Sequence, residues 1–135
     1  MKHKTNYDKV REFHEAFGHA LDYDLEVRSD AGHSRAELRY RLIDEEFDEL
    51  ISELFDANKK KLAKEIADLL YVTYGLAATY GIDIDTVFNL VHESNMSKLG
   101  EDGKPIYRDD GKVLKGPNYK EPDLDTWYDM AERIR

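Results

Sequence analysis

Hydrophobic and polar positions alternate with helical period through most of the first 98 residues. The pattern predicts a first helix from about Asn6 to Phe17 that stops at Gly18, a residue suited to a helix C-terminus. Mixed polar residues and one glycine occupy positions 19 to 33, which indicates a loop. The chain therefore opens with a short helix and a connection before its longer periodic segments.

A second helix is expected to follow this loop. Ser34 is the predicted N-cap, and Glu37 three residues later would complete a capping box. From there to about Phe55 the apolar residues recur at helical spacing, so the segment should have one buried face. That face would consist of Ile43, Phe47, Leu50, Ile51 and Leu54.

A third helix is predicted from Asn58, as its cap, to near Tyr80, with Gly81 closing it. Between residues 66 and 80 almost every position is apolar, small or aromatic, apart from Asp68. A helix that is apolar on all sides is typical of a central position in a helical domain. We therefore expect this helix to be buried.

The remaining chain changes in character. A fourth helix is expected from about Asp85 to Lys98, and all three prolines and half of the glycines lie between residues 100 and 122. The stretch "IYRDDGKVL" predicts a short β-hairpin around Asp110 and Gly111. Asp123 or Asp125 would start a last helix.

The predicted fold class is all-α: a four-helix bundle-like domain with a short C-terminal β-hairpin arm and a terminal helix. One domain would cover residues 1–135, with motif helices at about 34–55 and 58–80 and a substrate-binding arm at about 95–122.

Composition excludes several function classes. The 135 residues are 41% hydrophobic and 36% charged, with a net charge of −9, which disfavours binding to nucleic acid polymers. No cysteine is present, so thiolate metal sites and disulfides are excluded. The apolar run at 66–80 is too short for a membrane span, and residues 1–10 have no apolar core of a secretory signal. We expect a cytoplasmic protein.

Two pairs of acidic residues carry the candidate chemistry. Glu65 and Asp68 are three residues apart, about 60° apart around their helix, in apolar surroundings. Glu46 and Glu49 have the same spacing beside the apolar stripe of the preceding helix. A short connection makes the two helices antiparallel, so the four carboxylates would face each other and repel. A hard, oxygen-preferring cation, Mg²⁺ or Mn²⁺, removes this conflict.

These acids have other interpretations. A single pair at this spacing is common on a solvated helix face, and for Glu46 and Glu49 taken alone that reading is favoured; the second pair on the adjacent helix makes the metal reading the sharper one. A di-iron bundle needs a histidine three residues after each of two glutamates. None of the five histidines has that spacing, which favours Mg²⁺ over iron.

The pattern Glu46-x-x-Glu49, fifteen residues, then Glu65-x-x-Asp68 resembles the ExxE…ExxD signature of the MazG-like all-α nucleoside triphosphate pyrophosphohydrolases, which are related to phosphoribosyl-ATP pyrophosphohydrolase. The segments "VREFHEAFG", "SNMSKL" and "DGKVLKGPNYKEPDL" are similar to a single-domain subgroup of this family. The resemblance covers most of the chain.

This resemblance implies hydrolysis between the α- and β-phosphates of a nucleotide, giving a nucleoside monophosphate and pyrophosphate. The four motif acids would hold Mg²⁺, which polarises the phosphate and positions or activates the attacking water. Glu45, or an acid not fully committed to the metal such as Glu46 or Glu49, would accept the proton of that water. Family members form dimers or tetramers, so a homodimer or homotetramer is expected.

The same resemblance suggests the residues that hold the substrate. An Asn-x-x-Lys pair, here Asn95 and Lys98, would contact nucleotide and phosphate, and Lys115 and Tyr119 would be further phosphate contacts. The base needs an apolar wall, for which His14 and Phe17 are candidates, although core packing or a surface position is the plainer reading for residues of this region.

Two alternatives stay open. Phosphoribosyl-ATP would be a different substrate for the same chemistry, and the long Gly/Pro/Lys tail after Asn95 argues against it. A non-catalytic helical regulatory module, whose acids hold only a structural cation, would bind metal without hydrolysing any nucleotide.

Overall fold

The structure is a computed structural model that describes residues 3–134. All of its secondary-structure elements within that range are helices, which confirms the all-α class. The chain divides into two compact units, Met1–Ile84 and Asp85–Arg135, and each is described by itself. Whether residues 1–135 act as one domain therefore stays a prediction. The helices are α1 (Asn6–Phe17), α2 (Asp30–Phe55), α3 (Lys59–Thr79), α4 (Ile84–Met96) and α5 (Leu124–Ile134).

The first helix has the predicted bounds. The Thr5 hydroxyl accepts a hydrogen bond from the Asp8 backbone N–H, and the Asp8 carboxylate accepts one from Thr5 N–H, which forms a capping box. At the other end Gly18 adopts a left-handed conformation with φ of 71°. Both ends of α1 are therefore fixed by local residues, and its limits were predictable for that reason.

The predicted start of the second helix was wrong. The helix begins at Asp30, and Ser29 is its cap, with Ser29 Oγ 3.0 Å from the Gly32 nitrogen. The Glu26 carboxylate accepts hydrogen bonds from the backbone N–H and the hydroxyl of Ser29, and so turns the chain there. Ser34 consequently lies inside the helix. The hydrogen bonds between Glu26 and Ser29 therefore start the helix at Asp30, ahead of the expected start, and the predicted capping box of Ser34 and Glu37 does not form its N-terminus.

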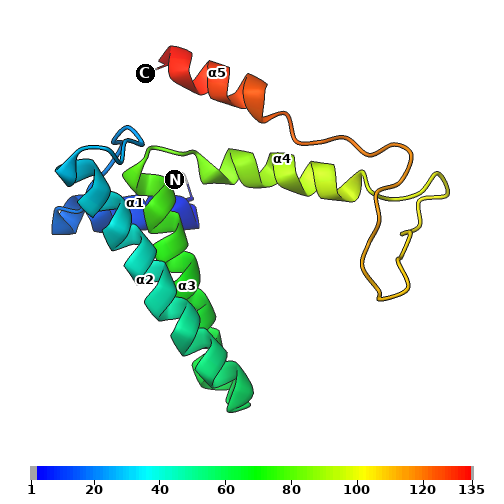
Figure 1. Cartoon of the computed structure of the whole chain (residues 1–135), viewed down its shortest axis with the longest axis horizontal. Helices are drawn as coiled ribbons and strands as arrows, with labels where there is room; N and C mark the ends of the chain where they lie inside the picture. Colours follow the sequence, from blue (N-terminus) through cyan, green and yellow to red (C-terminus); the bar gives the residue numbers. More distant parts are fainter. Residues whose placement is uncertain (1–2, 135) are drawn as a thin grey trace. The chain divides into compact units, whose positions relative to one another are not determined.

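A short connection joins α2 to α3. Asp56 caps the end of α2, Ala57 is left-handed with φ of 55°, and the Asn58 side chain accepts a hydrogen bond from Lys61 N–H. The predicted cap at Asn58 is confirmed. Figure 1 shows α2 and α3 side by side as an antiparallel hairpin, and α3 also packs against α1.

The core of the first unit lies where α1 meets the C-terminal half of α3. Tyr7, Ala77 and Ala78 are buried there, with Leu21, Tyr74, Ile82 and Ile84 packed around them. The loop after α1 is held against this core because Tyr23 N–H donates to the Thr79 carbonyl and Arg11 makes two hydrogen bonds to Asp22. This arrangement fixes the angle of α1 on the hairpin.

The expectation of a fully buried third helix was wrong for the single chain. Ile66 is 44% exposed, Leu70 51% and Tyr71 40%, and on α2 the expected core residue Phe47 is 50% exposed. The reason is that only α1 and α2 cover α3 within the first unit, which lacks the fourth helix of the predicted bundle. An apolar surface is therefore left on the hairpin.

The second unit contains α4, an irregular segment and α5. The Ser94 hydroxyl donates to the Lys120 carbonyl and Gly116 N–H donates to the Lys98 carbonyl, so the segment folds back on the end of α4. Of the two predicted caps for the last helix, Asp123 is the one used, because its carboxylate accepts from Thr126 N–H.

The predicted β-hairpin was wrong, since the described residues of this arm contain no strand. A single antiparallel bridge joins Tyr107 and Val113, with Arg108 N–H donating to the Lys112 carbonyl across the turn. Pro105 and Pro117 flank the bridge and have no N–H to extend the ladder. The Asp110-Gly111 turn formed, but not the strands around it.

No helix within residues 3–134 combines the length and the apolar character needed to cross a lipid bilayer.

Gly32→Ala should destabilise the protein although alanine favours helices. A Cβ at Gly32 would lie 2.2 Å from the Glu26 carbonyl oxygen, so the loop before α2 would have to move. We expect a loss of about 1–3 kcal/mol in the free energy of unfolding, measured by urea denaturation. Ala31→Gly at the neighbouring exposed position measures the propensity contribution alone. A Gly32→Ala variant as stable as the wild type would contradict this packing.

Candidate metal centre

Four carboxylates from α2 and α3 converge on one point of the hairpin. Glu46 and Glu49 come from α2, and Glu65 and Asp68 from α3. One oxygen atom from each side chain lies within 4.8 Å of those of the other three. The geometry therefore brings together the four acids that the sequence singled out.

Helical spacing and the antiparallel hairpin produce this cluster. Residues three apart lie on one face of a helix, so each helix presents a pair. Because α2 and α3 pack side by side along their length, the two pairs can oppose each other. Asp44 and Asp48 on α2 are exposed, as expected for acids on the solvated side of the same helix.

The cluster is electrostatically unfavourable by itself. Glu65 is only 8% exposed, and the Oε2 atoms of Glu46 and Glu65 are buried without a hydrogen-bond partner. Burial, and then repulsion from Glu49, Asp68 and Glu65, raise the pKa of Glu46 above its usual value. Buried oxygen atoms that lack a donor indicate that a positively charged group belongs among them.

Lys64, at the exposed edge of the cluster, partly neutralises this negative charge. Its ammonium nitrogen lies 2.6 Å from Asp68 Oδ2 and 3.5 Å from Glu65 Oε1, while its side chain is 67% exposed. The ion pair raises the pKa of Lys64, first through the hydrogen bond to Asp68. One exposed lysine cannot satisfy the two buried oxygens of Glu46 and Glu65, which have no hydrogen bond.

The donor set fits a hard divalent cation. All four side chains offer carboxylate oxygen, with no sulfur and no imidazole in the cluster, which is the ligand chemistry that Mg²⁺ and Mn²⁺ prefer. The two buried oxygens without partners lie on opposite helices, Glu46 on α2 and Glu65 on α3. Bound there, a cation would link the two helices and offset their repulsion.

The other predicted site residues of the first unit lie outside this cluster. Glu45 is exposed on α2 next to Glu46. His14 is buried at 2% exposure, with its Nδ1 2.9 Å from the Ala20 carbonyl oxygen, which places it in the interior rather than on an open wall. Phe17 is 68% exposed and stacked on Phe13. Substrate contact by these residues stays a prediction.

The predicted substrate residues of the second unit are grouped around the end of α4. Asn95 is exposed and Lys98 half-buried, and Lys98 N–H donates to the Asn95 carbonyl. The Lys115 ammonium lies 4.6 Å from the centre of the Tyr119 ring, a cation–π contact. Two predicted contacts thus form a pair, and their role toward a substrate stays a prediction.

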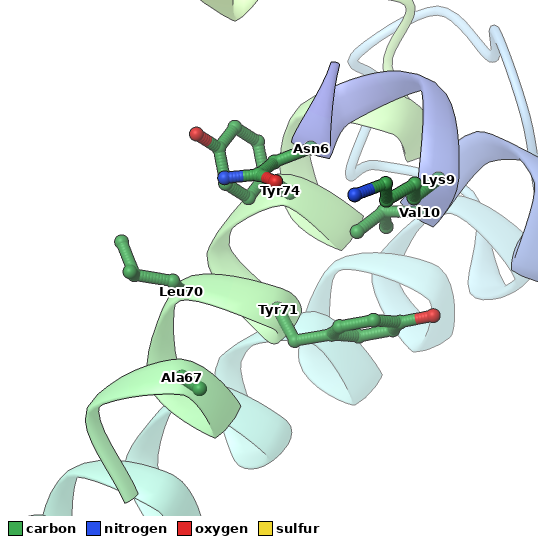
Figure 2. A pocket seen from close by; sticks show the side chains of 7 residues that line it. All are labelled: Asn6, Lys9, Val10, Ala67, Leu70, Tyr71 and Tyr74. Atoms are coloured by element: carbon green, nitrogen blue, oxygen red, sulfur yellow. The ribbon is translucent and has the colours of Figure 1, made fainter. Parts of the chain in front are cut away.

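A pocket of about 200 Å³ lies between α1 and α3. Figure 2 shows Asn6, Lys9 and Val10 on one side of it and Leu70 and Tyr71 on the other. None of the predicted site residues lines it, so its surface is distinct from the acidic cluster. Ala67 and Tyr74 complete the lining.

Comparison with known proteins identifies the family. The profile of a family described as phosphoribosyl-ATP pyrophosphohydrolase matches residues 10–95, which is more than half of the chain and includes all four acids. The chain belongs to the phosphoribosyl-ATP pyrophosphohydrolase family. This membership confirms the suspected relationship to the MazG-like pyrophosphohydrolases.

Two individual proteins are similar to this member of the family. Uncharacterized protein L479 of Acanthamoeba polyphaga mimivirus is 30% identical over 112 residues, which are 82% of this chain and 42% of that protein. The chain therefore spans less than half the length of this curated relative. A crystal structure from Exiguobacterium sp. 255-15, of a protein named as a candidate NTP pyrophosphohydrolase, aligns with a TM-score of 0.49 and 22% identity over 98% of both chains.

Lys64 lies near the site but was not among the predicted site residues, because it is exposed and lies off the buried face of α3. The spacing of four residues between Lys64 and Asp68 is nevertheless visible in the sequence and is that of a helical ion pair.

Glu46→Gln should separate the two effects of the cluster. Without divalent cations this variant should melt no lower than the wild type, because it removes the charge from a half-buried carboxylate whose buried Oε2 has no hydrogen-bond partner. Mg²⁺ at about 100 times its Kd should stabilise the wild type by about 2.7 kcal/mol and the variant much less. Thermal melts in EDTA and in Mg²⁺ measure both.

Asp44→Asn is the matched control, because it removes one acid of the same helix from the exposed side. It should keep the full response to Mg²⁺. Equal responses of wild type and Glu46→Gln would show that the cluster does not bind the cation.

Proposed function

We propose that this protein is a Mg²⁺-dependent nucleoside triphosphate pyrophosphohydrolase. It would cleave the bond between the α- and β-phosphates of NTPs or dNTPs and release a nucleoside monophosphate and pyrophosphate. The observation that carries the proposal is the convergence of four carboxylates within 4.8 Å, two of them with buried oxygens that lack a donor. Family membership supplies the reaction class.

Glu46, Glu49, Glu65 and Asp68 would hold Mg²⁺, for which Mn²⁺ could substitute. A cation so bound supplies Lewis acidity toward a phosphate oxygen and toward water. The chain's own part is to hold carboxylates that can take a proton from the attacking water. Glu45, exposed on α2 beside the cluster, is the first candidate for this role, and Glu46 and Glu49 are the candidates among the acids of the cluster.

The substrate triphosphate needs cations that the acidic cluster does not provide. In the proposed function Asn95, Lys98, Lys115 and Tyr119 contact the nucleotide phosphates. The exposed Phe17 lines the base, and the buried His14, also predicted for this wall, would have to be uncovered to reach it. Support for the first group is the density of positive side chains in this arm of an otherwise acidic chain. They are Lys98, Lys104, Arg108, Lys112, Lys115 and Lys120.

Phosphoribosyl-ATP is a second candidate substrate, favoured by the description of the matched family. The match ends at residue 95 and leaves the arm and α5 outside it, which favours a substrate handled differently from that of the family's namesake. The regulatory alternative keeps the cation and lacks hydrolysis. An assay of hydrolysis with NTPs, dNTPs and phosphoribosyl-ATP distinguishes these functions.

The protein should act as an oligomer, either a homodimer or a homotetramer. The support is the apolar surface that the α2–α3 hairpin leaves exposed, since such surfaces on a globular protein commonly mark interfaces. A second copy would supply the cover that the first unit lacks. The residues concerned are Phe47, Leu54, Phe55, Ile66, Leu70 and Tyr71.

Glu49→Gln and Asp68→Asn should each abolish pyrophosphate release from the common NTPs and dNTPs in Mg²⁺. Loss of an outer partner of a metal ligand costs about 10–100-fold, so loss of a ligand itself should cost at least about 100-fold. Circular dichroism should show an unchanged helical content, because neither carboxylate is needed to form its helix.

Asp48→Asn provides the control, since Asp48 lies beside Glu49 on α2 but is exposed outside the cluster. It should retain turnover within about threefold of the wild type. Normal turnover by either site variant would refute the assignment of the site. A wild type that binds Mg²⁺ but hydrolyses neither NTPs, dNTPs nor phosphoribosyl-ATP would favour the regulatory module.

Leu70→Asp should reduce the oligomer to a monomer. Leu70 is 51% exposed on the apolar surface of α3, and a buried unpaired carboxylate would strongly disfavour association. Size-exclusion chromatography with light scattering at micromolar concentration measures the change. A wild type that is monomeric under these conditions would contradict the oligomer.

A further inference from the structure

Arg39 is a buried arginine without an acidic partner. It lies on α2, is 4% exposed, and forms no ion pair with any carboxylate among residues 3–134. Its closest side-chain contact is between Nη2 and His19 Nδ1 at 3.5 Å, at the long limit for a hydrogen bond. A guanidinium has five N–H donors, so most of its capacity is unused by side chains.

The surroundings of Arg39 leave room for its head group but offer no negative charge. A Cβ at Gly75 of α3 would lie 3.0 Å from Arg39 Nη1 and 3.1 Å from His14 Nε2, so the glycine provides the space that both occupy. His14 is bonded through Nδ1 to the Ala20 carbonyl. Burial, and to a smaller extent Arg39 itself, lower the pKa of His14, which favours the uncharged form of its ring.

Tyr80 adds a second unused donor in the same part of the first unit. Its hydroxyl oxygen is buried and has no hydrogen-bond partner. It also interacts electrostatically with Arg39, although burial is the main influence on that guanidinium and lowers its pKa. Because arginine does not lose its proton in proteins, an anion from outside the chain would supply the negative charge that residues 3–134 do not provide.

This cationic site is separate from the acidic cluster. Arg39 precedes Glu46 by seven residues, which is two helical turns on the same face of α2 and about 10 Å along its axis. The carboxylates attract a cation, whereas Arg39 would repel one. The two sites therefore select ligands of opposite charge.

We propose that Arg39, together with the Tyr80 hydroxyl and the exposed His19, forms a binding site for an oxyanion of the phosphate class. A planar guanidinium can donate two parallel hydrogen bonds to two oxygens of such an anion. The single long contact to the His19 imidazole leaves this capacity unused. His19 provides the open side, because it is exposed whereas Arg39 and His14 are buried. This site goes beyond the proposed hydrolysis, because it needs no metal ion.

The experiment titrates inorganic phosphate into the full-length protein in EDTA, at constant ionic strength, and follows the Tm and the NMR signal of the His19 ring. At phosphate about ten times its Kd the wild type should gain about 4 °C in Tm, with a saturable shift of the His19 signal. Arg39→Met should lose both responses and, without phosphate, melt no lower than the wild type. Arg39→Lys should respond at several-fold higher phosphate.

Arg41→Met is the matched control, an exposed arginine on the same helix, and should respond as the wild type does. A nucleoside monophosphate tested in place of phosphate shows whether the anion belongs to a nucleotide, in which case it saturates at a lower concentration. Equal responses of all variants would mean an adventitious ion only. An unmoved His19 signal, or an Arg39→Met variant destabilised equally with and without phosphate, would overturn the site.

Discussion

Repulsion among carboxylates is the constraint on which the hairpin of this protein depends. The helices α2 and α3 carry the most extensive packing of the first unit, yet they bring four acids within 4.8 Å. Apolar contacts hold the helices together against this repulsion, and the ion pair between Lys64 and Asp68 within α3 offsets part of the negative charge. A fold that accepts such a cost at one place is storing electrostatic energy that a cation can release. The repulsion that lowers the stability of the hairpin without a cation is therefore also a source of its affinity for one.

The first unit also separates charges of opposite sign along one helix. Arg39 and Glu46 lie on the same face of α2, two turns apart, and each is poorly matched by the residues around it. If they faced each other directly they would form an ordinary salt bridge and neither would need a ligand. Their separation leaves two groups of opposite charge on one helix, each able to pair with a ligand rather than with the other.

Local signals made much of the fold predictable. Thr5, Gly18 and Asn58 act through their own neighbours, and these ends were placed correctly. The prediction of Ser34 as the cap was wrong because the Glu26 carboxylate, three residues before Ser29, accepts hydrogen bonds from Ser29 and the helix begins there. Burial of α3 was overestimated because it depends on what packs against the helix, which periodicity does not reveal. The acid cluster was predictable because helical spacing and a short connection determine it, whereas Arg39 depends on a space left by Gly75 thirty-six positions away.

The short connection at Asp56–Asn58 has a consequence for how this hairpin can vary among relatives. Each added or deleted residue within a helix turns everything beyond it by about 100°, so a change between Glu49 and Phe55, or between Lys59 and Glu65, would swing one pair away from the other. Residues inserted at the left-handed Ala57 leave both helical registers untouched. Insertions and deletions in such hairpins should therefore concentrate in the connection between α2 and α3, while the length of each helix between the connection and its acid pair stays constant.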